Sequence, residues 1–91
     1  MSKPTFAQVW DRINTHVGQT FHTKTGMEFT YDISGETFFS SRANQRIPKS
    51  DFAGAYAIVP IEGPGKINQL SRGPAYVWAV LHDVRISKGQ W

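Results

Sequence analysis

Apolar residues near the start of the chain recur every three or four positions, the spacing of one face of a helix. These residues are Phe6, Val9, Trp10, Ile13 and Val17. Thr5 and Gln8 have the spacing of a capping box, in which each side chain accepts a hydrogen bond from the other residue's free backbone N–H. Gly18 is typical of the position just after a helix. The pattern predicts an amphipathic helix over residues 5–17.

The apolar rhythm then changes to a period of two, which is typical of a half-buried strand. The apolar positions of this stretch are Met27, Phe29, Tyr31 and Ile33. A threonine-rich run over residues 20–25 precedes Gly26, and a third run over residues 36–41 follows the turn signal Ser34-Gly35. We therefore expect a three-stranded antiparallel meander with one face packed on the first helix.

Helical spacing returns in the second half of the chain. One helical face is Phe52, Ala55, Tyr56 and Val59, and another is Tyr76, Val77, Val80, Leu81 and Val84. Ile47-Pro48 precedes the first of these helices and Pro60 ends it, whereas Pro74 opens the last helix, which runs to about Val84. A short helical turn is expected over residues 66–70. The predicted fold is thus α+β in one domain over residues 1–91: an N-terminal helix, the meander, then two or three C-terminal helices packed on one sheet face.

Composition narrows the class of protein. The chain has 91 residues, 40% of them hydrophobic and 19% charged, with a formal net charge of +3 and no cysteine. This is a globular composition of mildly basic charge, and it excludes a disulfide scaffold, a thiolate nucleophile and a zinc site with cysteine ligands. No stretch approaches the roughly 20 apolar residues of a transmembrane helix, and no signal peptide is recognisable. We expect a cytoplasmic protein that does not bind membranes.

The last predicted helix carries a second face besides its core face. Trp78, His82 and Arg85 follow one another at four and three residues, so a continuous helix would bring them together. Tryptophan and arginine are favoured anchors of protein interfaces, and the same side chains can stack on nucleobases. The face is predicted as an interaction surface for a protein partner or a second copy of the chain, with simple burial against another element as the alternative.

A basic segment lies between the strands and the next helix. The residues that could contact phosphates or base edges are Arg42, Asn44, Gln45, Arg46 and Lys49, with Arg72 at the start of the last helix. Phe38 and Phe39 adjoin this segment, and one of them must point away from the core because successive strand side chains alternate. Ser71 to Pro74 could also hold an anion at the start of the helix. A solvated loop and an ordinary helix start are the alternatives.

The sequence shows no catalytic signature. The three histidines lack zinc spacing, the carboxylates are scattered, and no residue is marked as a nucleophile. Glu28 and Asp32 share one strand face, which we expect to be the solvent side. We expect no cofactor, no metal and no enzymatic activity, although a pocket with perturbed titratable groups stays open as an alternative.

Several short motifs are spread over most of the chain. They are Gly18-x-x-Phe21-x-Thr23, Phe29-Thr30-Tyr31, Ile47-Pro48-x-Ser50-Asp51-Phe52, Gly63-Pro64, Arg72-Gly73-Pro74-Ala75-Tyr76-Val77-Trp78-Ala79-Val80-Leu81 and Asp83-x-Arg85-Ile86. In this combination the chain resembles small uncharacterised bacterial proteins, including the kind carried on mobile integron gene cassettes. The resemblance implies a bacterial origin and an accessory role, and it assigns no functional residue.

Two functions follow as hypotheses. The first is a non-enzymatic interaction or binding module, homodimeric or with a protein partner, that uses the Trp78, His82 and Arg85 face or an exposed part of the sheet. The alternative is a winged-helix-like nucleic-acid-binding protein that uses the basic 42–49 segment, with the final helices as a helix-turn-helix.

Overall fold

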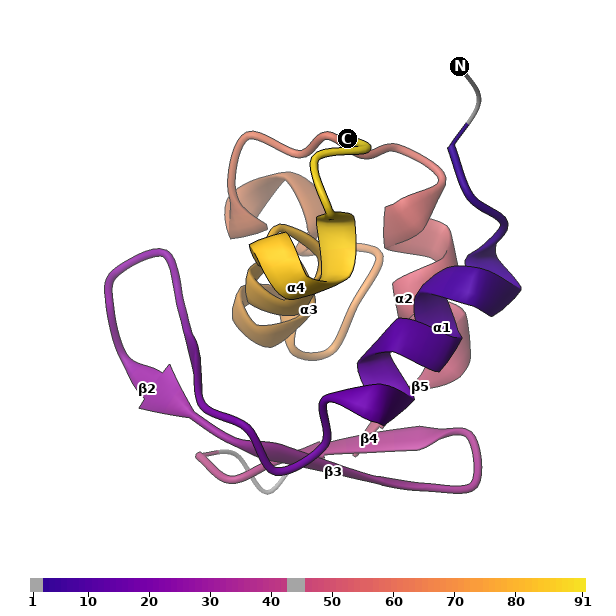
Figure 1. Ribbon diagram of the computed structural model, residues 1–91. Coiled ribbons are helices and arrows are strands. Elements are labelled where there is room, and N and C mark those ends of the chain that lie inside the picture. Colours follow the sequence, from indigo (N-terminus) through magenta and orange to yellow (C-terminus); the bar gives the residue numbers. More distant parts are fainter. Residues whose placement is uncertain (1–2, 43–45) are drawn as a thin grey trace.

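The computed structural model describes residues 3–42 and 46–91 and has an α+β fold. The elements in chain order are α1 (Phe6–Thr15), β1 (Phe21–His22), β2 (Glu28–Phe29), β3 (Tyr31–Ser34), β4 (Thr37–Ser40), β5 (Arg46–Pro48), α2 (Lys49–Tyr56), the 3-10 helix η1 (Pro64–Ile67), α3 (Pro74–Leu81) and α4 (Val84–Ser87). The helices gather on one side of the sheet formed by β3, β4 and β5 (Figure 1). The predicted fold class is confirmed.

Helix α1 begins at the predicted capping box. The Gln8 N–H donates to Thr5 Oγ1 at 3.3 Å, and the Thr5 N–H donates to Gln8 Oε1 at 3.0 Å. Val9, Trp10 and Ile13 are buried as expected. The helix ends at Thr15 rather than residue 17, so Val17 lies beyond it and is 37% exposed.

The predicted meander is present, but different strands form it. β3, β4 and β5 pair antiparallel in that order, with Phe38 opposite both Ile33 and Ile47. The run predicted as the first strand pairs instead with the start of the alternating stretch, as the separate hairpin β1–β2, in which Phe21 faces Phe29. The alternating stretch therefore contributes to two sheets, divided at Thr30, and Met27 lies outside both and is exposed.

Strand β5 corrects the expectation of a loop between the strands and the second helix. Arg46, Ile47 and Pro48 pair with β4, and Ile47 is fully buried. Helix α2 then begins at Lys49, and its predicted core residues Phe52, Ala55 and Tyr56 are buried. Part of the basic segment is thus an edge strand of the sheet β3–β4–β5, here called the main sheet.

A chain of aromatic rings joins the sheet to the helices. Tyr31 of β3 stacks on Phe38 of β4 with ring centroids 4.7 Å apart, and Phe38 contacts Phe52 of α2 at 4.9 Å. Phe52 in turn meets the edge of Trp10 of α1 at 5.6 Å. Burying such large rings supplies much of the apolar area that a short chain can remove from water.

The last predicted helix is broken into two. α3 begins at Pro74 as expected but ends at Leu81, and Asp83 adopts an extended conformation and caps a new turn, α4. Val77, Val80 and Leu81 are fully buried as predicted. Val84, expected on the core face, is 75% exposed, because it begins the new turn instead of continuing α3.

Candidate functional site

Trp78 of α3 and His82, the C-cap of α3, are brought together as their spacing predicts. Their rings stack with centroids 5.0 Å apart and an interplanar angle of 13°. Both also bind the backbone of Ile61, since Trp78 Nε1 donates to the Ile61 carbonyl at 2.8 Å and the Ile61 N–H donates to His82 Nε2 at 2.9 Å. The pair therefore holds the connector between α2 and η1 against α3.

The hydrogen bonds of His82 define its chemical state. Nδ1 lies 3.1 Å from the Trp78 carbonyl and can only donate to it, while Nε2 accepts from Ile61 and so carries no proton. Burial lowers the pKa of His82, and the bond to the Trp78 carbonyl opposes that change. His82 is a neutral residue in a structural contact, with both ring nitrogens occupied.

Arg85 does not share a helix face with Trp78 and His82, which corrects the predicted arrangement. The break after Leu81 places Arg85 on α4, whose N-cap is Asp83. The prediction that one continuous helix brings the three side chains together therefore holds for Trp78 and His82 but not for Arg85. Whether any of the three contacts a partner stays a prediction.

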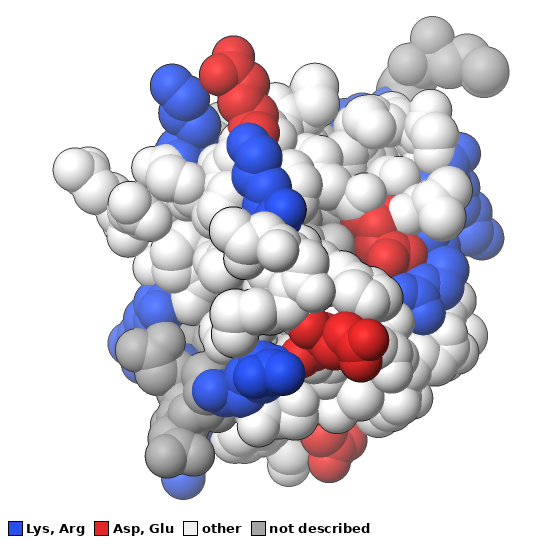
Figure 2. Space-filling model, turned by 90° about the vertical axis from the view of Figure 1, so that its left-hand side faces the viewer, with Lys and Arg blue, Asp and Glu red and all other residues white. Residues whose placement is uncertain are grey.

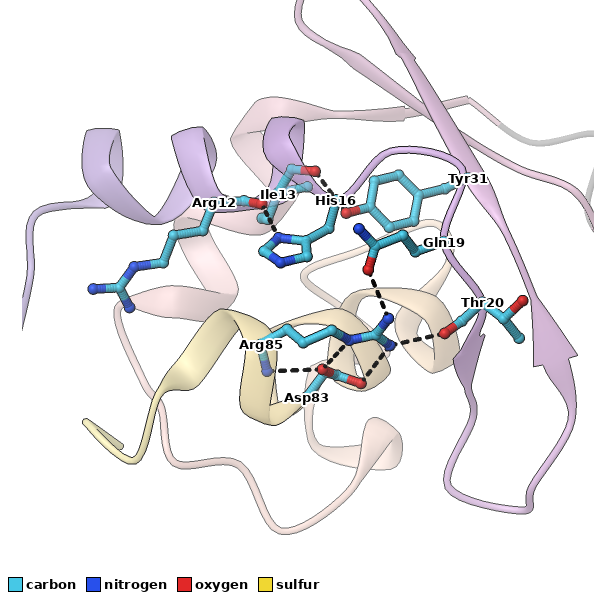
Figure 3. A network of polar contacts seen from close by, with 8 residues as sticks. All are labelled: Arg12, Ile13, His16, Gln19, Thr20, Tyr31, Asp83 and Arg85. Atoms are coloured by element: carbon cyan, nitrogen blue, oxygen red, sulfur yellow. Dashed lines mark hydrogen bonds and ion pairs between the residues drawn. The ribbon is translucent and has the colours of Figure 1, made fainter.

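Arg85 joins α4 to the segment that follows α1, as Figure 3 shows. Its Nε and one Nη donate to the two Asp83 carboxylate oxygens at 2.8 and 2.9 Å. The other contacts of its guanidinium are Gln19 Oε1 at 3.1 Å, the Thr20 carbonyl at 2.8 Å and the Phe21 ring, 3.8 Å from the centroid. The guanidinium group of Arg85 thus holds residues 19–21 against α4.

The electrostatics of this network are those of a stable ion pair. Burial on its own would raise the pKa of Asp83, but the hydrogen bonds and charge of Arg85 lower it overall. The same hydrogen bond raises the pKa of Arg85. Nearby, the Tyr31 hydroxyl donates to the Ile13 carbonyl at 2.6 Å, and burial raises the pKa of Tyr31 while Arg85 opposes the shift. These groups are held in their ordinary charge states.

The basic residues are spread over several elements. Arg46 lies exposed on β5, Arg42 follows β4, and Lys49 begins α2, where its Nζ lies 3.3 Å from Glu36 Oε2. Asn44 and Gln45 lie outside the described residues. On the side of the molecule seen in Figure 2, basic groups are separated by acidic and uncharged ones. The described residues on that side therefore form no continuous basic surface.

Two backbone donors of the anion site considered at the start of α3 are already occupied. The Gly73 N–H donates to Ser71 Oγ at 3.1 Å, and the Arg72 N–H donates to Asp51 Oδ2 at 3.1 Å. Pro74 has no N–H. Arg72 itself is exposed.

The side chains of the main sheet that point away from the helices form a second face, here called the outer sheet face. Its residues are Asp32, Ser34, Thr37, Phe39, Arg46 and Pro48. Phe39 is at its centre, on the middle strand, with Asp32 opposite on β3 and Arg46 opposite on β5. No element of the described chain covers this face (Figure 1). The alternation of Phe38 and Phe39 indicated an outward ring and Arg46 was already a candidate contact, but no sequence signal indicated β5 or the pairing of Arg46 with Phe39.

The edges of this sheet are poorly suited to pairing with another strand. On β3, Asp32 Oδ1 accepts from the Ile33 N–H at 2.9 Å, and the Tyr31 carbonyl accepts from Gly18 at 3.0 Å. On β5, Pro48 lacks an N–H and Arg46 places a charge at the edge. Charges, prolines and internally bonded edge groups all disfavour strand addition. Of this sheet, the outer sheet face is thus better suited to a ligand than either edge.

Residues 3–42 and 46–91 contain no group of three side chains able to hold a metal ion. Within the same residues, no helix has both the length and the apolar character needed to cross a membrane. Glu28 and Asp32 are both exposed to solvent, as expected.

Comparison of the chain with protein-family models, with curated proteins and with solved structures gives no match.

Proposed function

We propose that the protein is a non-enzymatic binding module whose ligand is single-stranded nucleic acid, held on the outer sheet face. The observation that carries this proposal is the placement of Phe39 at the centre of an uncovered sheet with Arg46 directly opposite on the next strand. An aromatic ring can stack on any base, and a neighbouring arginine can neutralise a phosphate or stack in turn. The net charge of +3 favours a polyanion.

The site differs from the winged-helix arrangement considered above. In that arrangement a helix enters the major groove of duplex DNA. Here α3 buries Val77, Ala79, Val80 and Leu81 in the core, and α4 is one turn long. A sheet face with a single outward aromatic ring suits an unpaired strand, whose bases are free to stack. The proposal therefore keeps the nucleic-acid hypothesis and changes the surface and the form of the ligand.

The expected affinity is modest. One base stacked on an aromatic ring contributes about 1–3 kcal/mol, and each neutralised phosphate adds a salt-dependent term with a slope of about −0.7 for single strands. Arg46 lies opposite Phe39 and Arg42 follows β4, while Asp32 opposes their charge, so we expect one or two phosphates to be neutralised. We therefore expect weak binding that is visible at low salt and diminishes between about 50 and 200 mM salt.

Fluorescence anisotropy with a labelled mixed-sequence 12-nucleotide single strand tests the proposal at low and moderate salt. Phe39→Ala should weaken binding about five- to 150-fold, which corresponds to the loss of one stacked base. Arg46→Ala should weaken it and lower the salt dependence. Lys66→Ala removes the same charge from η1 and serves as the matched control, with binding unchanged. If the native protein does not bind at low salt, or if Phe39→Ala folds and binds like the native protein, the proposal is wrong.

The homodimer and the partner surface at Trp78, His82 and Arg85 stay predictions. Sedimentation of the native protein over a range of concentrations tests the first. Partner capture with a folded Trp78→Phe variant, which keeps the ring but not the indole N–H, tests the second.

A further inference from the structure

A groove leads away from Phe39 at the end of β4. One hollow of about 250 Å³ is lined by Thr30, Tyr31, Asp32, Phe39, Ser40 and Ser41. A second hollow of about 430 Å³ is lined by Thr20, Glu28, Phe29, Thr30, Ser41 and Arg42. Thr30 and Ser41 line both hollows, so the two adjoin; together they are called the groove, with Phe39 in the lining of one hollow and Arg42 in the lining of the other.

The middle of the groove is fixed by its backbone. The Ser41 N–H donates to the Thr30 carbonyl at 2.9 Å, and the Thr30 N–H donates to Ser41 Oγ at 3.0 Å. Ser41 Oγ accepts this bond, so its own proton is available to a ligand. The Thr30 hydroxyl has no partner among the described residues. Both residues shared by the two hollows thus carry a hydroxyl group, and two hydrogen bonds hold the two residues together.

The end of the groove offers a positioned cation. The Arg42 N–H donates to Ser40 Oγ at 3.2 Å, and its Nε donates to the Glu28 carbonyl. A guanidinium has five N–H donors, so the four on the Nη atoms are left for an anion. A planar fork held in place by Nε suits the oxygens of a phosphate.

We infer that the groove binds the sugar–phosphate backbone next to the base on Phe39, and that the protein prefers single-stranded RNA to single-stranded DNA of the same sequence. This rests on the proposed function. The ribose 2′-hydroxyl both donates and accepts hydrogen bonds and is what distinguishes RNA from DNA at a protein site. Thr30 and Ser41 supply matching hydroxyl groups between the stacked base and the phosphate at Arg42. One such hydrogen bond changes affinity about two- to tenfold.

The test compares a 12-nucleotide oligouridine with the oligodeoxyuridine of the same length, which has the same bases and lacks only the 2′-hydroxyls. The native protein should bind the RNA about two- to tenfold more tightly. Thr30→Val keeps the shape of the side chain and removes its hydroxyl, so it should bring the ratio of the two affinities close to one. Thr37→Val is the matched control on the same outer sheet face but outside the groove, and it should leave the ratio unchanged.

The outcomes separate this inference from the proposed function. Equal binding of both oligonucleotides, still dependent on Phe39, overturns the RNA preference and leaves the binding surface in place. A preference for RNA that Thr30→Val and Ser41→Ala both leave unchanged overturns the assignment to this groove. Absence of binding to both oligonucleotides overturns the proposed function, and the RNA preference with it.

Discussion

Protonation of His82 should weaken the fold, because the ring holds the Ile61 N–H only while Nε2 lacks a proton. Burial lowers the pKa of His82 in the folded protein below its ordinary value of 6.5. Above pH 6.5 the ring is neutral in both states, and the full stabilisation is present. As the pH falls below that value the unfolded chain takes up the proton first, so the free energy of unfolding decreases, by at most about 1.4 kcal/mol per pH unit.

The same contact also predicts how much the free energy of unfolding falls at neutral pH when the His82 ring nitrogens are removed. Ile61 is 6% exposed, and a buried N–H that loses its acceptor costs about 1–3 kcal/mol. His82→Phe keeps a ring to stack on Trp78 and removes both nitrogens, so it should reduce the free energy of unfolding by about that amount at pH 7.5. A loss of 1 kcal/mol in a domain of this size lowers the melting temperature by about 4–8 °C. The variant should also show a smaller decrease in stability between pH 7.5 and pH 5.

Urea unfolding followed by tryptophan fluorescence measures both effects. His22→Gln is the matched control, because it also removes one histidine but from an exposed strand position, and it should keep the native decrease with pH. If His82→Phe is as stable as the native protein at pH 7.5 and loses as much stability at pH 5, the bond to Ile61 does not hold the connector and the reasoning is wrong.

Three further predictions concern stability. Gly73→Ala should lower the free energy of unfolding, measured in urea, by about 1–3 kcal/mol, because the added Cβ would lie 2.5 Å from Ile47 Cδ1. As its control, Gly54→Ala in α2 places the Cβ in open space and should raise the free energy of unfolding by up to about 1 kcal/mol. Arg85→Lys keeps the charge but not the planar fork to Asp83, so it should lower the free energy of unfolding by about 1–3 kcal/mol, and native stability would contradict the network. Because Arg85 lowers the pKa of Asp83, the stability from this pair is present above the ordinary value of 3.8 and is lost as the pH falls further; Asp83→Asn should lose less stability between pH 5 and pH 2.

Local signals account for the parts of the fold that the sequence predicted. The capping box at Thr5 and Gln8 and the apolar spacing after it define a helix without reference to the rest of the chain, and α1 begins where they indicate. The alternation around Tyr31 likewise defines strand faces. The fold class follows from such patterns because each one must bury a single apolar side.

The features that were missed depend on contacts between distant residues. β5 has three residues, one of them a proline, so it has no measurable period and is a strand only because β4 pairs with it. The break before α4 had a local signal, since Asp83 is a good N-cap, but the apolar spacing of Val80 and Val84 favoured a continuous helix. The contact between Trp78 and His82 was predictable because His82 is still the C-cap of α3, whereas Arg85 was misplaced because it lies beyond the extended Asp83.

The position of α4 has a consequence for how the chain is made. Arg12 of α1 donates to the Ile86 carbonyl at 2.8 Å, and Arg85 donates to the Thr20 carbonyl, so contacts that fix the N-terminal quarter come from residues 65 and 74 positions later. A nascent chain leaves the ribosome N-terminus first and forms distant contacts only after their later partner has emerged. Helix α1 and the segment after it therefore lack these contacts until residues 85 and 86 have emerged, which is after the intervening strands and helices have been translated.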